Sequence, residues 1–285
     1  MDDYVKKPEC PVRKHRVLHS GLGPMKKPEI SPPRKHLKAL FDVIITLLLW
    51  SYYTLGFIFF FSPFYLVSYL FSENCERSFQ RLNHRFYKGF FLLARILIPW
   101  TKWRIQDEVC AIRSSVIVCN HVSYLDPILL ISLFEKHRTI VKSRFFSLPI
   151  FGRVLELSGY IPSSCEGNLS SLMIQRTEEM DGYLASGGNL FVFPEGTRSV
   201  DGTIGRLNKG AFKIAKFCRK PIRVLFVRNT DKLFRPGRFL FNTCVPNLIT
   251  VEQLASIEPD YQSSDFSISE LVSQVRSSLE ARSAE

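Results

Sequence analysis

The chain has 285 residues, 46% of them hydrophobic, and carries a formal net charge of +12. The hydrophobic content is ample for the core of one large domain, or of one domain plus a small one. The charge predicts an anionic partner, either nucleic acid or a membrane surface, and the 24 Phe favour the membrane. The seven Cys are scattered without a C-x-x-C pair, which argues against metal ligation and indicates free thiols in a reducing compartment.

The beginning of the chain is rich in proline and in basic side chains, and we expect residues 1–38 to form a mostly disordered arm. A solvated tail and an arm attracted to anionic lipid both fit this composition. In the second case each basic residue near the surface adds about 1 kcal/mol of attraction.

Val43–Phe71 is a run of 29 residues without a formal charge. A helix needs only about 20 residues to cross a hydrocarbon core about 30 Å thick. Ser62-Pro63 interrupts the run, so a single span competes with a helical hairpin that dips into one leaflet and turns near Pro63. Because both flanks of the run are basic, we expect both ends on the cytoplasmic face and prefer the hairpin.

The segment Glu76–Ile98 is amphipathic. Apolar residues recur along it every three or four positions and define one helical face: Phe79, Leu82, Phe86, Phe90, Leu93 and Leu97. We expect this face to pack on the folded domain that follows, and the basic face to contact the membrane interface. With the preceding run it makes up a membrane-associated segment, residues 39–98.

Short apolar strands then alternate with helices, which predicts an α/β fold of sheet and helix layers. The expected strands are 101–106, 116–118, 139–142, 189–193 and 222–227, and the expected helices are 128–133, 170–184 and one from 209. We assign residues 99–245 to this α/β domain. Residues 246–285 read as a helical tail to which we assign no role.

The strand Val116–Val118 runs into Asn120-His121. Ser123 offers an N-cap, with Asp126 at capping-box spacing ahead of an apolar helix. An imidazole and a carboxylate are therefore expected together at the carboxyl end of a strand, where α/β folds keep their sites.

The pairing of His121 with Asp126 predicts a dyad. A carboxylate that accepts the Nδ1 proton fixes the tautomer of the imidazole and leaves Nε2 free as a general base. No G-x-S-x-G motif supplies a serine nucleophile, so the base would activate a hydroxyl of the substrate. A histidine that merely satisfies a buried turn is the alternative that this window leaves open.

A second polar loop follows the strand Asn189–Phe193. Pro194 and Gly196 force a tight turn. The turn presents three polar side chains, Glu195, Thr197 and Arg198. Arg198 is a planar, permanently charged donor suited to phosphate.

The two loops together resemble a known family. Asn120-His121-x-Ser123-x-x-Asp126 and Phe193-Pro194-Glu195-Gly196-Thr197-Arg198 look like the first and third sequence blocks of the glycerolipid acyltransferases, the family of 1-acyl-sn-glycerol-3-phosphate acyltransferase. Both blocks are present in the family's order, and the resemblance covers residues 40–230.

The resemblance implies a membrane-bound enzyme that moves a fatty acyl group from a thioester of coenzyme A or acyl carrier protein to a lysophospholipid hydroxyl. The implied acceptor is 1-acylglycerol-3-phosphate and the product is phosphatidic acid. We expect membrane lipid as a partner, no nucleic acid, no metal and no bound cofactor.

The resemblance also implies roles for individual residues. His121 takes the acceptor proton directly, without an acyl-enzyme, Asp126 stabilises the imidazolium, and backbone N–H groups near Ser123 steady the developing oxyanion. The residues expected to bind substrate are Asn120, Ser123, Lys142, Glu195, Gly196, Thr197, Arg198 and Lys209.

The sequence departs from the family in two places. The second block usually carries an arginine that helps to hold the acceptor's phosphate, and the similar stretch Gly159–Cys165 has none. Pro221 matches the first proline of the fourth block, and the second is missing. Arg198, Lys209 and Lys142 could form a weaker phosphate site. One alternative acceptor is a lyso-lipid without phosphate, such as a lyso-aminolipid. A non-catalytic membrane-anchored binding protein of the same fold is a further alternative.

Overall fold

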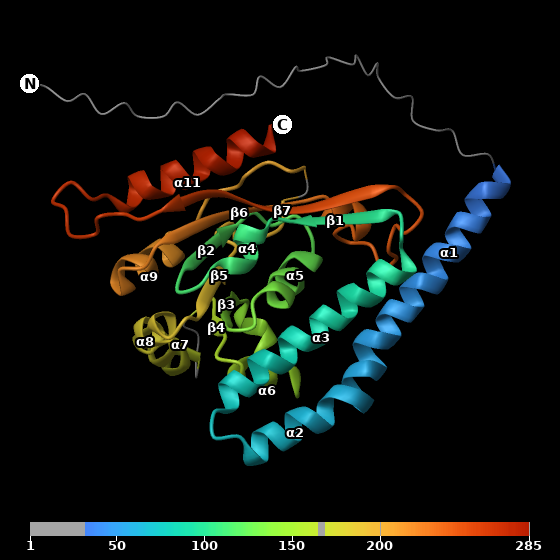
Figure 1. Cartoon of the computed structure of the whole chain (residues 1–285), viewed down its shortest axis with the longest axis horizontal. Coiled ribbons are helices and arrows are strands. Elements are labelled where there is room, and N and C mark those ends of the chain that lie inside the picture. The colour runs from blue at the N-terminus through green and yellow to red at the C-terminus, as the bar shows by residue number, and fades with distance from the viewer. Residues whose placement is uncertain (1–31, 165–168, 200, 285) are drawn as a thin grey trace, which may run out of the picture.

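The computed structural model describes residues 32–164, 169–199 and 201–284 (Figure 1). The arm predicted at residues 1–38 therefore lies mostly outside the described residues. In the described part, a seven-stranded sheet forms the centre and helices cover both of its faces, so the predicted α/β layered fold is confirmed.

The strands follow the order β1-β7-β6-β2-β5-β3-β4 across the sheet. Strands β2 to β6 run parallel, whereas β7 pairs antiparallel with β6 and parallel with β1. The bounds are β1 (Thr101–Ile105), β2 (Val116–Cys119), β3 (His137–Val141), β4 (Ile161–Pro162), β5 (Asn189–Val192), β6 (Ile222–Arg228) and β7 (Asn247–Ile257).

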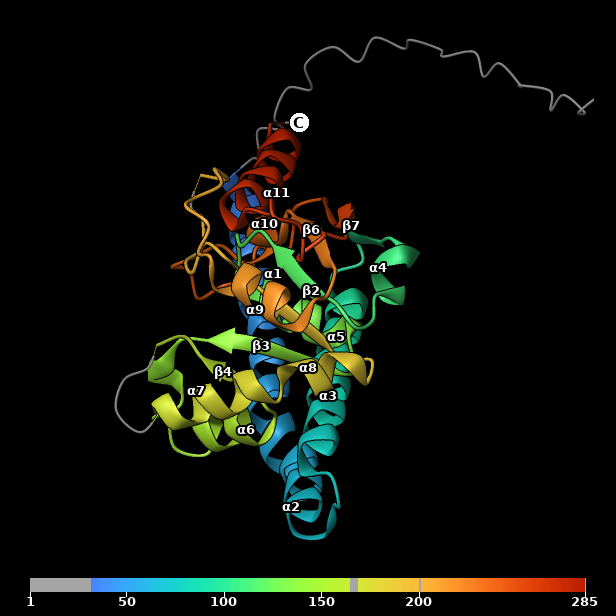
Figure 2. The same ribbon diagram turned by 90° about the vertical axis from the view of Figure 1, so that its left-hand side faces the viewer.

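The helices form two layers around this sheet. In Figures 1 and 2, α3 and α5 lie on one side and α8, α9 and α11 on the other. The bounds are α1 (Pro32–Ser51), the π-helix η1 (Tyr52–Phe61), α2 (Ser62–Phe71), α3 (Cys75–Leu97), α4 (Asp107–Ala111), α5 (Leu125–Leu133), the 3₁₀ turn η2 (Ser143–Phe145), α6 (Phe151–Leu157), α7 (Leu169–Glu178), α8 (Met180–Ala185), α9 (Gly210–Cys218), α10 (Thr230–Leu233) and α11 (Ile268–Ser283).

Alternate side chains of the central strands pack into two separate hydrophobic cores, one on each face of the sheet. In β2, Ile117 and Cys119 enter the core beneath α3 and α5, whereas Val116 and Val118 enter the core beneath α9 and α11. All four are fully buried, as expected for a strand covered by helices on both faces. Because β2 lies in the middle of the sheet, the turn that follows it is held from both sides.

One continuous helical run, formed by α1, η1 and α2, precedes the sheet. Its segment Lys35–Phe71 is long and apolar enough to cross a membrane, and only 17% of its most apolar window is buried. The predicted turn near Pro63 is wrong, because the helix continues through it. Pro63 lies in the first turn of α2, where the π-helical widening and a hydrogen bond from Ser62 Oγ to Ile58 O (2.5 Å) accommodate the break in the backbone ladder.

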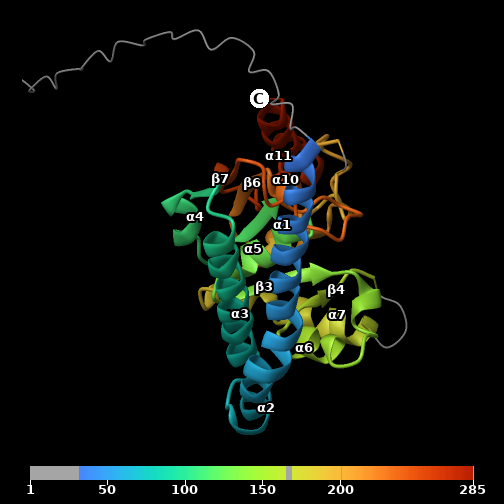
Figure 3. The same ribbon diagram turned by 90° about the vertical axis from the view of Figure 1, so that its right-hand side faces the viewer.

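The chain reverses instead at residues 72–74, and α3 returns alongside the first run (Figure 3). Phe79, Phe86 and Phe90 of α3 are buried, which confirms the predicted packing face. Phe86 packs against four aromatic rings of the first run: Tyr52, Tyr53, Phe57 and Phe61. The helical pair therefore exists, with its turn one helix later than predicted.

A buried polar chain joins this pair to the sheet. Tyr65 Oη donates to Asn83 Oδ1 (2.5 Å), Asn83 Nδ2 donates to Tyr160 Oη (3.2 Å), and Tyr160 pairs with His137 Nε2 (2.7 Å). His137 Nδ1 lies 2.7 Å from Phe134 O. The chain runs from α2 through α3 to β3 and fixes their mutual positions.

The assignment of residues 246–285 to a helical tail is wrong in its first part. Residues Asn247–Ile257 form β7, which is paired on both sides inside the sheet. Its alternation is irregular because a bulge at Val224/Leu225 shifts the register against β6, so it lacks the clean period of two that marks a strand. The second part is α11, whose Val275 is fully buried against the sheet layer.

Candidate active site

The candidate site begins where β2 ends. Asn120 is 2% exposed and its side-chain amide clamps β6, accepting from Val227 N (2.7 Å) and donating to Val227 O (2.8 Å). Ser123 is fully buried and its Oγ donates to Phe234 O (2.8 Å). Both were predicted to bind substrate. The structure uses their polar groups to shape the turn that carries His121.

His121 and Asp126 meet across this turn. Nδ1 of His121 lies 2.9 Å from Oδ2 of Asp126, and 15% of the imidazole is exposed whereas the carboxylate is fully buried. Because an ionised carboxylate can only accept, Nδ1 carries the proton and Nε2 holds a free lone pair. The predicted dyad geometry is therefore present at the carboxyl end of β2.

The Asp126 carboxylate is satisfied by four donors. Oδ2 also accepts from the backbone N–H groups of Val122 and Ser123, both at 2.7 Å. Oδ1 accepts from Thr230 Oγ1 at 2.5 Å. Four donors compensate an anion that is fully buried. Thr230 lies in α10, more than a hundred residues away, and nothing in the sequence marked it.

The Asp126 contacts also correct the expected oxyanion site. The N–H groups of Val122 and Ser123 point at the carboxylate, and the N–H of Leu125 donates to Ser123 Oγ (3.2 Å). These groups are therefore not free for a developing oxyanion.

The second predicted loop is tied directly to the first. His121 donates its backbone N–H to Glu195 Oε1 (3.2 Å), and Ser199 donates its N–H to His121 O (2.8 Å). The imidazole of His121 stacks on Phe193, with the ring centroids 4.4 Å apart. Residues far apart in the sequence thus hold the base on three sides.

Glu195 acts as the strut between these loops. Its other oxygen accepts from Gly205 N (2.9 Å). Burial raises the pKa of the Glu195 carboxyl above its usual value, while the N–H groups of Gly205 and His121 act in the opposite direction. Both oxygens are engaged inside the protein, so Glu195 supports the loop and does not point a free carboxylate at a ligand.

Arg198 lies on the far side of the same loop. Its Cζ is 3.4 Å from the centre of the Tyr124 ring. Its Nη1 is buried, and within the described residues it has no hydrogen-bond partner. An unpaired buried guanidinium nitrogen in the loop that is bonded to His121 is the feature that a phosphate or carboxylate oxygen would satisfy.

The remaining predicted binding residues form no hydrogen bond or ion pair with the His121–Asp126 pair in the described structure. Gly196, with φ +69°, and Thr197 are exposed in the loop. Lys142 is exposed at the end of β3, and Lys209 donates to Ser269 of α11 (2.8 Å). Among the described residues, no hydrogen bond or ion pair joins either lysine to His121 or Arg198.

The stretch that resembles the second block follows β4 at the same edge of the sheet. Ser164 Oγ donates to Ser143 Oγ (2.8 Å), and Ser143 N donates to Ser163 Oγ (3.4 Å). Cys165 lies outside the described residues. The family's arginine usually stands at this last position of the stretch, and the described part before it holds serine hydroxyls that bind one another.

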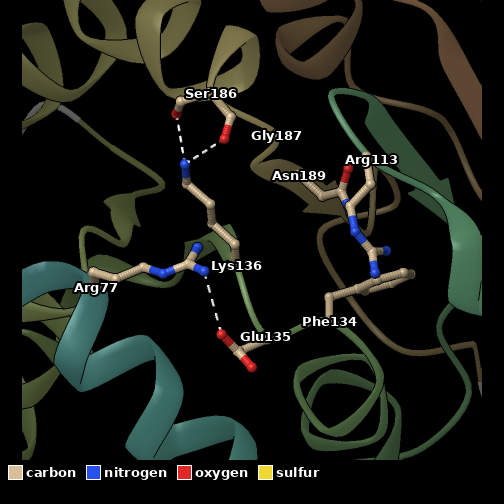
Figure 4. Close-up of a pocket in the computed structure, with 8 residues that line it drawn as sticks. All are labelled: Arg77, Arg113, Phe134, Glu135, Lys136, Ser186, Gly187 and Asn189. Carbon is tan, nitrogen blue, oxygen red and sulfur yellow. Dashed lines mark hydrogen bonds and ion pairs between the residues drawn. The ribbon is translucent and has the colours of Figure 1, made fainter.

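Two cavities lie at the amino-terminal end of β3. One of about 330 Å³ is lined by Arg77, Arg113 and Lys136 (Figure 4). Each cation is already engaged: Lys136 Nζ with Ser186 O, Arg77 with Glu135, and Arg113 with backbone carbonyls. These contacts stabilise the ends of helices and form an ion pair within the protein. Over residues 32–164, 169–199 and 201–284, no cluster of three His, Cys, Asp or Glu side chains is placed to hold a metal ion.

Comparisons with known proteins agree with the two loops. Residues 101–225 match the family model described as Acyltransferase. The chain is 34% identical over 123 residues to a chloroplast 1-acyl-sn-glycerol-3-phosphate acyltransferase of Brassica napus, which covers 43% of this chain and 35% of that protein. A protein of the same name from Saccharomyces cerevisiae is 27% identical over 158 residues, 54% of this chain and 51% of that one. The chain thus matches about a third to a half of the length of these relatives.

A solved structure has the same fold. The crystal structure of the 1-acyl-sn-glycerophosphate acyltransferase from Thermotoga maritima superimposes with a TM-score of 0.64 and covers 86% of this chain and 97% of that one, at 20% sequence identity. At this identity the match concerns the fold. Together with the family model, it confirms the resemblance that the two sequence blocks predicted.

Proposed function

Because residues 101–225 form a domain of the acyltransferase family, we propose that this protein transfers a fatty acyl group from an acyl thioester to the hydroxyl of a lysophospholipid. The acceptor we propose is 1-acylglycerol-3-phosphate, which gives phosphatidic acid. The observation that carries the proposal is the His121–Asp126 pair at 2.9 Å, tied through Glu195 to the loop of Arg198. A base and an anion-binding group are thereby held at one edge of the sheet.

The proposed reaction is a single displacement through a tetrahedral intermediate. Nε2 of His121 takes the proton of the acceptor hydroxyl, and the oxygen attacks the thioester carbonyl carbon. The intermediate collapses, the C–S bond breaks, and the imidazolium returns its proton to the thiolate. Asp126 holds the imidazole by Nδ1 throughout and stabilises its charged form.

We propose that Arg198 binds the acceptor's phosphate. The guanidinium is the group beside the dyad with a buried, unpartnered nitrogen in the described structure, and paired N–H donors suit a phosphate. The absence of a second arginine from the stretch Gly159–Cys165 favours one competing acceptor, a lyso-lipid without phosphate such as a lyso-aminolipid. The acyl donor is a thioester of coenzyme A or of acyl carrier protein.

We further propose that the enzyme works at the cytoplasmic face of a membrane. The apolar face of Lys35–Phe71 supports membrane association. The exposed face of α3 alongside it carries Arg81, Arg85 and Lys88, which favours a helical pair lying in one leaflet over a deep span. Failure of a membrane-impermeant thiol reagent to label exposed Cys110 in intact cells would agree with this side.

The test is an acylation assay on the purified full-length protein in detergent, with acyl-coenzyme A or acyl carrier protein thioester as donor. Lysophosphatidate and an uncharged lyso-lipid are offered separately, and mass spectrometry identifies the product. We expect phosphatidic acid. In Arg198→Ala the KM for lysophosphatidate should rise while kcat changes little, because a phosphate contact is made in both the ground state and the transition state. Acylation of only the uncharged acceptor would replace the proposed substrate, and absence of any acylation would favour the non-catalytic alternative.

A further inference from the structure

We propose that Tyr124 is a positioning residue that makes the site selective for a phosphate-bearing acceptor, by holding the guanidinium of Arg198 on its ring; this inference rests on the proposed function. The relevant geometry is the short distance of 3.4 Å from Arg198 Cζ to the ring centre. Such a stack is a cation–π contact, in which the negative face of the ring attracts the cation.

The ring is fixed relative to the catalytic base. Tyr124 immediately follows Ser123 in the turn, and Ser123 is anchored by its bond to Phe234 O. The ring also packs near Phe234, with centroids 6.2 Å apart. Because His121 and Tyr124 share this anchored turn, a guanidinium placed on the ring is also placed relative to Nε2 of His121.

Holding Arg198 by a ring has a chemical consequence. A carboxylate partner would neutralise the guanidinium and occupy its N–H groups, and among the described residues Arg198 has no such ion pair. A ring covers one face and leaves the edge N–H groups available for two phosphate oxygens. The contact also reduces the side-chain freedom that Arg198 loses when the ligand binds.

The same arrangement accounts for a departure from the family pattern. Because the stretch Gly159–Cys165 lacks the arginine that is usual there, one guanidinium has to hold the phosphate. A single donor gains more from being held in place than one of a pair does. Tyr124 thus matters here because the second donor is absent.

The test compares Tyr124→Leu with Tyr124→Phe in steady-state assays of the full-length enzyme, with lysophosphatidate and an uncharged monoacylglycerol as acceptors. Loss of the ring should raise the KM for lysophosphatidate about three- to tenfold, the size expected of an exposed to partly buried cation–π contact. The kcat should stay within about twofold, and so should the KM for the uncharged acceptor. Tyr124→Phe retains the ring and should restore the KM.

Two further variants keep the proposal falsifiable. In an Arg198→Ala background, Tyr124→Leu should add no further increase in KM, because the two residues act through one contact. Phe217→Leu removes a ring of similar exposure on α9 and serves as the control for loss of a surface aromatic. Arg198→Lys keeps the charge without the flat stack and should raise the KM even if Tyr124→Leu folds poorly.

Three results would overturn the role of Tyr124: an unchanged KM in Tyr124→Leu, an equal increase for both acceptors, or an increase that persists in the Arg198→Ala background. These outcomes are distinct from failure of the proposed function, which would appear as wild-type enzyme that does not acylate lysophosphatidate at all.

Discussion

At the scale of single residues, Asp126 is the centre of the site. Its two oxygens bind His121, two backbone N–H groups of the same turn and Thr230. The carboxylate thus orients the base and at the same time fastens the turn to α10. Removing His121 takes away the base itself, and removing the Asp126 carboxylate takes away the group that orients the base. Either change should therefore disable proton transfer.

We expect His121→Ala and Asp126→Asn each to lower kcat about 10² to 10⁴-fold, the range of general-base catalysis. The double variant should be scarcely slower than the more severe single one, because the two groups act as a unit. Initial rates at saturating acceptor measure this, with circular dichroism to confirm folding. Wild-type turnover in His121→Ala would mean that another group takes the proton.

Thr230 should contribute to both stability and rate. In Thr230→Val the buried Oδ1 of Asp126 loses its donor, which should cost about 1 to 3 kcal/mol of unfolding free energy. The matched Thr230→Ser keeps the hydroxyl and should lie much closer to the wild type. Chemical unfolding in a fixed detergent, combined with kcat, checks both effects. Equal stability of the valine and serine variants would show that this hydrogen bond is dispensable.

The sequence allowed His121 and Asp126 to be paired because they lie five residues apart in one turn, where the spacing alone indicates that the side chains are close. It did not show Thr230 or the stack of Tyr124 on Arg198, because those contacts arise only when the sheet brings distant turns together. The backbone contacts of Asn120 and Ser123 could not be foreseen for a related reason. An amide or a hydroxyl that clamps backbone looks the same in a sequence as one that binds a ligand.

At the scale of secondary-structure elements, the hydrogen-bonded series from Tyr65 to His137 does something that the apolar packing around it does not. Tyr65, Asn83 and Tyr160 are buried and hydrogen-bonded in series. A buried network in which every polar group is hydrogen-bonded stabilises one relative position of α2, α3 and β3, because any other position would leave buried polar groups without partners. It therefore sets how the helical pair sits on the sheet, which apolar contacts alone leave adjustable.

His137 makes this arrangement sensitive to acid. Burial lowers its pKa from 6.5 to about 3. The folded state keeps the imidazole neutral while the unfolded chain takes up a proton, so stability is complete above about pH 6.5 and falls as the pH drops below it, by roughly 1.4 kcal/mol per pH unit. Unfolding free energies measured between pH 7 and pH 5 should show this slope.

His137→Gln is the matched variant, because an amide can still donate to Phe134 O and accept from Tyr160. We expect its stability to change less over the same pH range. An identical pH dependence in the two proteins would assign the acid sensitivity to other groups.

Strands and helices were predictable from the sequence where apolar residues recur at regular spacing. The short strands around β2 and the apolar face of α3 follow from periodicity, and both are confirmed. Pro63 misled the prediction because the π-helical segment just before it and the bond from Ser62 Oγ to Ile58 O let the helix continue past the proline. The strand β7 was missed because its pairing depends on β1 and β6, which flank it only in the folded sheet.

At the scale of the whole molecule, one long apolar surface stands out. Residues of α1, η1 and α2 expose large side chains that no described element covers, including Phe59, Phe60, Phe64 and Phe71. A surface of this extent marks contact with lipid or with another protein. Since α3 buries the opposite face of the same run, the exposed face can be altered without opening the core.

Replacing Phe60 and Phe64 together by Ser should therefore release the protein from vesicles without unfolding it. The two rings are 70% and 61% exposed, and removing them should weaken vesicle binding by about tenfold or more. Vesicle flotation measures the bound fraction, and Phe217→Ser, a similarly exposed ring on α9, is the control. Unchanged flotation of the double variant would exclude this face as the contact with lipid.

The place of β7 between β1 and β6 has a consequence for biosynthesis. As the chain leaves the ribosome, β1 and the apolar run appear early, but the neighbour of β1 is β7, and the partners of α1 at Phe241 and Thr243 come just before it. Throughout that interval α3 is available to cover one face of the apolar run, and the opposite face stays exposed. With the proposed membrane association, this order of synthesis favours insertion of the apolar run first and closure of the sheet last.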